Sequence, residues 1–153
     1  MKDEKEKMKL LVLNGPNLNM LGTRQRDVYG TKSYEELAAE IMNWAQESGF
    51  EATVRQSNHE GVLIDLIQGA QIMGYDALLI NPGAYAHYSY AISDALRCIA
   101  LPKAEVHLSD IDNREDFRKL SVTAAACDKI IVGLGFEGYR QAIVYLSKIA
   151  REH

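Results

Sequence analysis

Apolar and polar positions along this chain alternate in blocks, and the apolar blocks predict five buried strands. Each block is short, rich in Leu, Ile and Val, and bounded by Gly, Pro, Asn or charged residues, which is typical of a strand buried on both faces. The predicted strands are residues 9–13, 52–55, 77–80, 103–106 and 129–132.

Between the strands, apolar residues recur every three to four positions, which predicts helices. Ser33 and Glu36 form a capping box that begins the first of them, and Gly49 supplies a left-handed end. Its apolar face is Leu37, Ile41, Trp44 and Ala45. The further helices are predicted at residues 61–73, 89–100 and 136–151, with a short one near 114–120.

Strands that alternate with helices predict a parallel sheet covered on both faces. We therefore expect an α/β fold, a flavodoxin-like three-layer sandwich whose five-stranded parallel sheet has the order 2-1-3-4-5. Residues 9–153 are predicted to form this single domain. Residues 1–8 are nearly all charged and are predicted to be a solvated N-terminal tail.

Composition and charge argue against some classes of binding partner. The chain has 153 residues, of which 47% are hydrophobic and 25% charged, and a formal net charge of -4. This balance argues against nucleic acid and membrane partners. No apolar run reaches the length of a membrane span or a signal core, so we expect a cytoplasmic protein. Cys98 and Cys127 show no metal or disulfide spacing and are expected to be small buried hydrophobes.

Polar residues follow the ends of the first, third and fourth predicted strands. In an open α/β sheet these ends meet in one crevice, where ligands bind. The loop at 14–32 is long for such a connection and is expected to act as a lid, with Gly22 and Gly30 as hinges. It carries Asn17, Arg24 and Tyr29.

Glu105 and His107 are the strongest candidates for acid–base chemistry. Side chains two apart on a strand point to the same side, so the carboxylate lies beside the imidazole. Such a carboxylate fixes the tautomer of the ring and supports the imidazolium. A pair with a purely structural role remains the alternative.

Tyr29 is a candidate base because Arg24 lies five residues before it. A phenol has a pKa near ~10, and lowering it to ~8 requires about 2.7 kcal/mol. One guanidinium at ~4 Å supplies up to about 4 kcal/mol at an effective dielectric of ~20. A single arginine therefore suffices to lower the pKa of Tyr29 to about 8.

The motifs give less support to a dinucleotide, zinc or magnesium site. Gly133, Gly135 and Gly138 fit a dinucleotide fingerprint, but no further strand follows, so we expect a tight turn and close helix packing. The four histidines lack zinc-site spacing, and Asn14 and Asn81 replace the acids of a receiver-domain magnesium site. His59 is expected to be structural or to support the site through another residue.

At these residues the chain resembles the type II 3-dehydroquinate dehydratases. The segments 14–22, 56–61, 80–85, 105–109 and 133–139 fit the family pattern in order. The resemblance implies no cofactor and no metal, a dodecamer of four trimers, and the reversible dehydration of 3-dehydroquinate to 3-dehydroshikimate through an enolate, within the shikimate pathway.

The resemblance also implies roles for individual residues. Tyr29 would take the C2 proton with Arg24 keeping it ionised, Asn17 would orient a water at the enolate, and His107 with Glu105 would protonate the leaving hydroxyl. Arg114 would support the site from outside. The residues implied to bind substrate are Asn81, His87, Asp94, Leu108, Ser109 and Arg118.

The chain departs from the family pattern at Gln25-Arg26, Tyr88, Ser93 and Asp110, none of which is a proposed catalytic position. Two other classes of function stay open at this point. One is a flavodoxin-like module that binds a nucleotide or flavin, supported by the Gly133–Gly138 turn. The other is an assembly protein without a small ligand.

Overall fold

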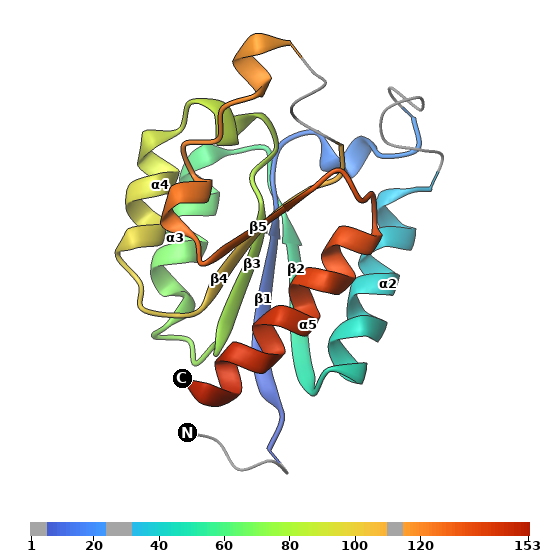
Figure 1. Cartoon of the computed structure of the whole chain (residues 1–153), viewed down its shortest axis with the longest axis vertical. Coiled ribbons are helices and arrows are strands. Elements are labelled where there is room, and N and C mark those ends of the chain that lie inside the picture. The colour runs from blue at the N-terminus through green and yellow to red at the C-terminus, as the bar shows by residue number, and fades with distance from the viewer. Residues whose placement is uncertain (1–5, 24–31, 110–114) are drawn as a thin grey trace.

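The computed structural model describes residues 6–23, 32–109 and 115–153. Its sheet has five parallel strands in the order β2-β1-β3-β4-β5, as the sequence predicts (Figure 1). The strands are β1 (Met8–Asn14), β2 (Phe50–Gln56), β3 (Ala77–Asn81), β4 (Lys103–His107) and β5 (Lys129–Val132). Met8, placed in the charged tail by the sequence pattern, is buried and begins β1.

In the described part of the chain, four α-helices cover the sheet, two on each face (Figure 1). They are α2 (Tyr34–Glu47), α3 (Glu60–Ala70), α4 (Tyr90–Arg97) and α5 (Glu137–Glu152). Helices α2 and α5 pack on one face around Leu10 and Val12 of β1. Helices α3 and α4 pack on the other around Leu11 and Leu13. Side chains along β1 therefore alternate between the hydrophobic cores on the two faces of the sheet.

Local signals place both ends of α2 where the sequence predicts. The Ser33 hydroxyl accepts a hydrogen bond from the Glu36 amide at 3.1 Å, which caps α2. Gly49 follows α2 with a φ of 85°. Helices α3 and α4 end three residues earlier than their apolar pattern predicts.

Short 3-10 turns replace or extend the predicted loops. They are η1 (Leu18–Met20), η2 (Gly83–His87), η4 (Asp116–Arg118) and η5 (Ala124–Ala126). The helix predicted near 114–120 is thus a single 3-10 turn in its described part. The sequence predicts that both cysteines are buried, but Cys98 is exposed at the C-cap position of α4 and Cys127 is half-buried.

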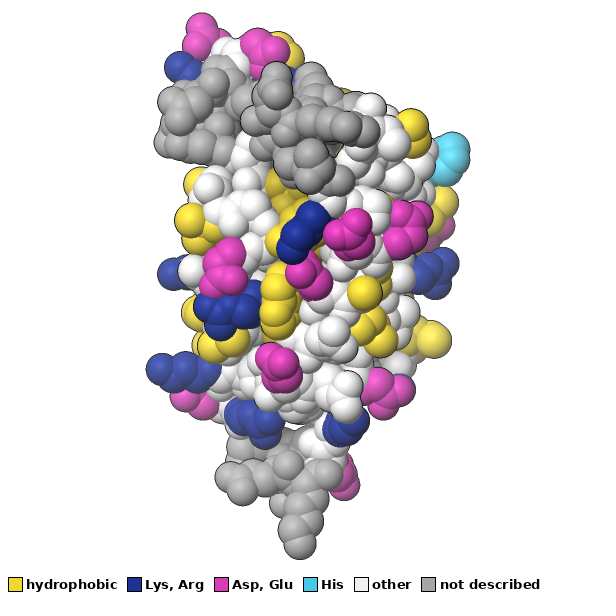
Figure 2. All heavy atoms as spheres, turned by 90° about the vertical axis from the view of Figure 1, so that its right-hand side faces the viewer, with side chains coloured by type: hydrophobic (Ala, Val, Ile, Leu, Met, Phe, Trp, Pro, Cys, Tyr) yellow, Lys and Arg dark blue, Asp and Glu magenta, His cyan; other side chains and the backbone are white. Residues whose placement is uncertain are grey.

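The face formed by α2 and its neighbours carries Lys, Arg, Asp and Glu side chains interspersed with one another (Figure 2). Mixed charges of this kind are typical of a solvated surface. No helix in the described residues combines the length and apolarity that crossing a bilayer requires.

Candidate functional site

The polar ends of β1, β3 and β4 lie at one edge of the sheet. Asn14 and Asn81 are register partners at the ends of β1 and β3, and His107 ends β4. The amide of Gly15 donates to the Asn81 carbonyl at 2.8 Å, so the two loops leave the sheet together. This is the edge at which ligands bind in open α/β sheets.

Glu105 and His107 form a buried pair on β4, as their spacing predicts. His107 Nε2 lies 2.7 Å from Glu105 Oε2, and the Glu105 side chain has no exposed surface. Both side chains lie on the face covered by α3 and α4, since Ala104 and Val106 belong to the opposite core. The strand therefore presents an imidazole whose Nε2 is already hydrogen-bonded to the Glu105 carboxylate.

Two hydroxyls that sequence reasoning missed complete the shell of Glu105. Ser121 Oγ donates to Glu105 Oε2 at 2.6 Å, and Thr123 Oγ1 donates to Glu105 Oε1. They come from the segment between η4 and η5, a polar stretch without periodicity. No pattern in that segment marks the two residues as partners of Glu105, which lies 16 and 18 positions before them.

Asn17 lies at the start of η1 in a left-handed conformation, with a φ of 69°. The backbone N–H of Asn17 donates to Asn58 Oδ1 at 3.0 Å. Gln56 Nε2 donates to both the Gly15 carbonyl and Asn58 Oδ1, each at 3.1 Å. Asparagine tolerates this backbone conformation better than most residues. The end of β2 therefore fixes the backbone at Asn17.

A second polar cluster joins β1, β3 and α5 on the other face of the sheet. The Tyr139 hydroxyl donates to Asn14 Oδ1 at 2.7 Å and accepts from Asn81 Nδ2 at 2.9 Å. Asn81 Oδ1 accepts from the Gly83 amide at 3.1 Å. Complete burial raises the pKa of Tyr139 well above its ordinary value. Tyr139 is therefore a neutral structural hydroxyl that orients Asn81.

His87 and Arg118 approach the same edge from η2 and η4. His87 Nδ1 donates to the Leu120 carbonyl at 2.8 Å, which fixes the tautomer because a carbonyl only accepts. The Arg118 guanidinium lies 3.0 Å from Glu115 Oε2 and 4.8 Å from the centre of the Phe117 ring.

The remaining predicted site residues differ in burial, and three of them lie outside the described residues. Leu108 is buried directly after β4, and its carbonyl accepts from the Gly135 amide at 2.9 Å; half-buried Ser109 follows it. Asp94 is exposed on α4, and within the described part of the chain it forms no hydrogen bond or ion pair with another candidate residue. Arg24, Tyr29 and Arg114 lie outside the described residues.

The glycine turn before α5 packs as predicted for a structural turn. Gly133 and Gly135 have φ values of 79° and 59°. A Cβ at Gly138 would lie 3.1 Å from Val106 Cγ2, so this glycine lets α5 approach β4. His59, the residue before α3, is exposed and forms no side-chain cap.

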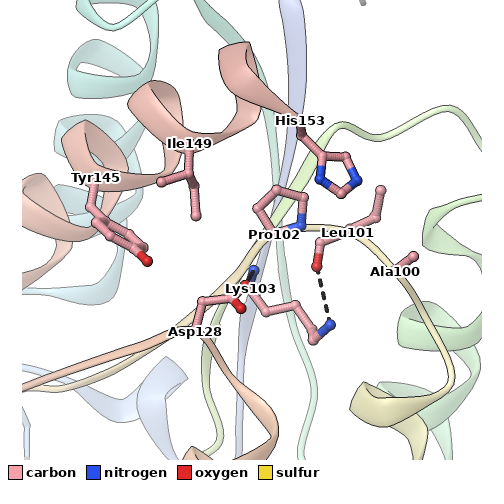
Figure 3. Close-up of a pocket in the computed structure, with 8 residues that line it drawn as sticks. All are labelled: Ala100, Leu101, Pro102, Lys103, Asp128, Tyr145, Ile149 and His153. Atoms are coloured by element: carbon pink, nitrogen blue, oxygen red, sulfur yellow. Dashed lines mark hydrogen bonds between the residues drawn. The ribbon is translucent and has the colours of Figure 1, made fainter.

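A hollow of about 340 Å³ lies at the opposite edge of the sheet, where β4 begins (Figure 3). Its buried cation, Lys103, already donates from Nζ to the carbonyls of Ile99 and Leu101 at 2.9 and 3.1 Å. Asp128 in turn accepts from the Lys103 amide. Lys103 and His107 are four residues apart on β4, about 13 Å, so this hollow is separate from the candidate site.

The residues described hold no cluster of three His, Cys, Asp or Glu side chains that could bind a metal ion. What the edge does offer is an imidazole with a carboxylate behind it, a second histidine of fixed tautomer, two asparagines and a guanidinium. These groups can exchange protons with a substrate and hold its hydroxyl or carboxylate groups.

Comparisons with known proteins agree on one family. The family model described as "Dehydroquinase class II" matches residues 8–147. A 3-dehydroquinate dehydratase of Thermotoga neapolitana is 54% identical over 145 residues, covering 95% of this chain and 98% of the relative. One from Deinococcus radiodurans is 51% identical over 140 residues, covering 92% and 98%.

Solved structures show the same relation. The crystal structure of a type II dehydroquinase from Butyrivibrio crossotus superposes with a TM-score of 0.90 at 50% identity, covering 92% of this chain and 97% of that one. That of Propionibacterium acnes has a TM-score of 0.89 at 40% identity, covering 94% and 98%.

Proposed function

The chain belongs to the class II dehydroquinase family, and on that premise we propose that it dehydrates 3-dehydroquinate reversibly to 3-dehydroshikimate. The observation that carries the proposal is the Glu105–His107 pair, 2.7 Å apart and buried at the edge where β4 ends. A β-hydroxy ketone loses water when a base removes the proton next to the ketone and an acid protonates the hydroxyl. The pair supplies such an acid.

Tyr29 is the proposed base and takes the proton from C2. Arg24 keeps the phenol ionised by its positive charge, and both residues stand between β1 and α2 in the sequence. Loss of the proton makes an enolate, which a water oriented by Asn17 stabilises by hydrogen bonding. The fixed backbone at Asn17 supports this role.

His107 is the proposed general acid. The C1–O bond breaks with its electron pair moving to oxygen, and the imidazolium gives that oxygen a proton so that water leaves. Glu105 stabilises the imidazolium before the step. The proposed substrate-binding groups are Asn81, His87, Asp94, Arg118 and the segment of Leu108 and Ser109, with Arg114 supporting them.

We further propose that the enzyme acts in the shikimate pathway in the cytoplasm as a dodecamer of four trimers. Residues 8–153 would form the catalytic domain, since Met8 already lies in β1. Sedimentation velocity of the purified chain measures the assembly directly, and a monomer in solution would contradict it.

Substitution of Tyr29 by Phe tests the assignment of the base. Turnover should fall by about 10²- to 10⁴-fold, the usual contribution of a positioned base, while calorimetry still detects substrate binding. Tyr75→Phe is the matched control, because Tyr75 precedes β3 at the opposite edge of the sheet. Near-normal turnover by the Tyr29 variant would exclude Tyr29 as the base.

A further inference from the structure

One short segment, Leu120–Thr123, contacts the surroundings of both candidate histidines. We call it the site strap. The carbonyl of Leu120 accepts a hydrogen bond from His87 Nδ1 at 2.8 Å, and the Val122 amide donates to the Ala86 carbonyl at 2.7 Å. Ser121 and Thr123 then donate to Glu105. The site strap therefore connects η2 with the Glu105–His107 pair.

The carboxylate of Glu105 is fully buried and accepts on both oxygens. Oε2 accepts from Ser121 and lies 2.7 Å from His107 Nε2, while Oε1 accepts from Thr123. No Lys or Arg among the described residues forms an ion pair with it. A buried carboxylate is stable in its charged form only when such donors replace the lost water.

The site strap is itself held in place. Ser121 Oγ accepts from the Ala124 amide at 3.1 Å and lies 3.2 Å from Thr123 Oγ1, and Thr123 has no exposed surface. Because a hydroxyl that already accepts points its hydrogen elsewhere, the Ser121 proton is directed at Glu105. The two hydroxyls are thus oriented before any substrate binds.

We propose that Ser121 and Thr123 are positioning residues that hold the shared proton of the Glu105–His107 pair on the imidazole. This rests on the function proposed above. Their hydroxyls keep the negative charge on Glu105, so the proton between Glu105 Oε2 and His107 Nε2 stays on the imidazole. The carboxylate held beside the ring then favours a second proton on Nδ1, which makes the ring an imidazolium. Nδ1 is then the nitrogen that gives its proton to the leaving hydroxyl, and the ring becomes neutral.

Removal of either hydroxyl should move the shared proton from the imidazole to the carboxylate. The carboxylate loses a donor in a place water does not reach, so the Nε2 proton moves to Glu105 Oε2 and both groups become neutral. A neutral imidazole N–H is a far weaker acid than an imidazolium. The chemical step should therefore slow, while the groups that bind substrate remain in place.

The test uses Thr123→Val, which keeps the shape of the side chain, and Ser121→Ala. For each we expect kcat to fall about 10- to 100-fold, a fraction of the full effect of a general acid, with KM changed by less than about threefold. In ¹⁵N spectra of histidine-labelled protein without substrate, His107 should change from imidazolium in the parent chain to neutral imidazole. His107→Gln assigns its signals.

Two further variants separate positioning from a structural effect. Thr123→Ser restores the hydroxyl and should recover most of kcat and the imidazolium signal. Ser147→Ala removes a hydroxyl that donates to the Ser48 carbonyl at 2.7 Å on the far side of the fold, and should change neither. If Thr123→Val does not fold, half-buried Ser121→Ala decides the question by the same two readouts.

The proposal is overturned if His107 is neutral in the parent chain, if it stays an imidazolium in the variants, or if their kcat equals that of the parent. Failure of the proposed function gives a different result. The parent chain would then not turn over 3-dehydroquinate, although the histidine spectra could still be read.

Discussion

Tyr139 illustrates how one buried hydroxyl can organise a site it does not enter. It satisfies two asparagines at the ends of β1 and β3, at 2.7 and 2.9 Å, from the first turn of α5. Buried amides without partners cost about 1–3 kcal/mol each. The side chain of Asn81 therefore keeps one orientation, with its oxygen on the Gly83 amide.

Substitution of Tyr139 by Phe should lower the free energy of unfolding by about 1–3 kcal/mol, since Asn14 and Asn81 lose a shared partner. We expect KM for 3-dehydroquinate to rise more than kcat falls. Urea unfolding and steady-state kinetics measure the two effects. Tyr145→Phe on the same helix is the control, and equal effects from both variants would contradict this role.

At the residue level the sequence reveals only contacts between near neighbours. The Glu105–His107 pair follows from strand alternation over two positions. Ser121 and Thr123 are 16 and 18 positions from Glu105, and Tyr139 is 125 positions from Asn14. Such contacts depend on how loops and helices return to the sheet, which no local pattern encodes.

At the level of elements, the loops after β1 and β3 are packed backbone against backbone. A Cβ built on Gly15 would lie 2.5 Å from the Pro82 carbonyl oxygen, a distance at which backbone must move. Gly83 approaches Pro16 in return, with a φ of 60°. The two loops that carry Asn17 and His87 are therefore locked together by glycine.

Gly15→Ala should separate these loops and lower both stability and turnover, with a loss in unfolding free energy of about 1–3 kcal/mol. Gly69→Ala is the matched control, because a Cβ there meets nothing within 4 Å and lies in α3. It should stabilise the protein by about 0.5–1 kcal/mol. Thermal or urea unfolding compares them, and an unchanged Gly15 variant would show that the contact is unimportant.

Strand order and helix layers followed from the sequence because apolar runs and helical periodicity report burial directly. The short 3-10 turns did not, since they lack periodicity and depend on contacts between loops. η2, for example, is fixed by the Tyr85 hydroxyl on the Asn58 carbonyl and by the site strap. The elements were thus predictable, but the arrangement of the loops that form the site was not.

At the level of the whole molecule, buried weak acids make stability depend on alkaline pH. Burial first, and the Glu105 carboxylate second, raise the pKa of Cys127 from 9.0 to about 12, and burial raises that of Tyr139 above 10.0. In the unfolded chain both groups lose their protons at ordinary values. Above pH 9 the unfolded state therefore binds fewer protons, and stability must fall as pH rises.

Each such group contributes a slope of about 1.4 kcal/mol per pH unit once its unfolded form is ionised and its folded form is not. For Cys127 that window is about pH 9 to 12, and the contribution is complete below it. Cys127→Ala should flatten the decline in this window, whereas exposed Cys98→Ala should not. Urea unfolding at several pH values measures the slopes, and identical slopes in all three proteins would refute the assignment.

The central claim is that this fold dehydrates 3-dehydroquinate by acid–base chemistry at the ends of β1, β3 and β4. The most direct measurement is an ultraviolet assay of enone formation from 3-dehydroquinate, in the presence of a chelator and borohydride. We predict full activity, because a tyrosinate and an imidazolium need neither a metal nor an imine to lysine. Loss of activity on borohydride treatment, or no enone at all, would contradict the account.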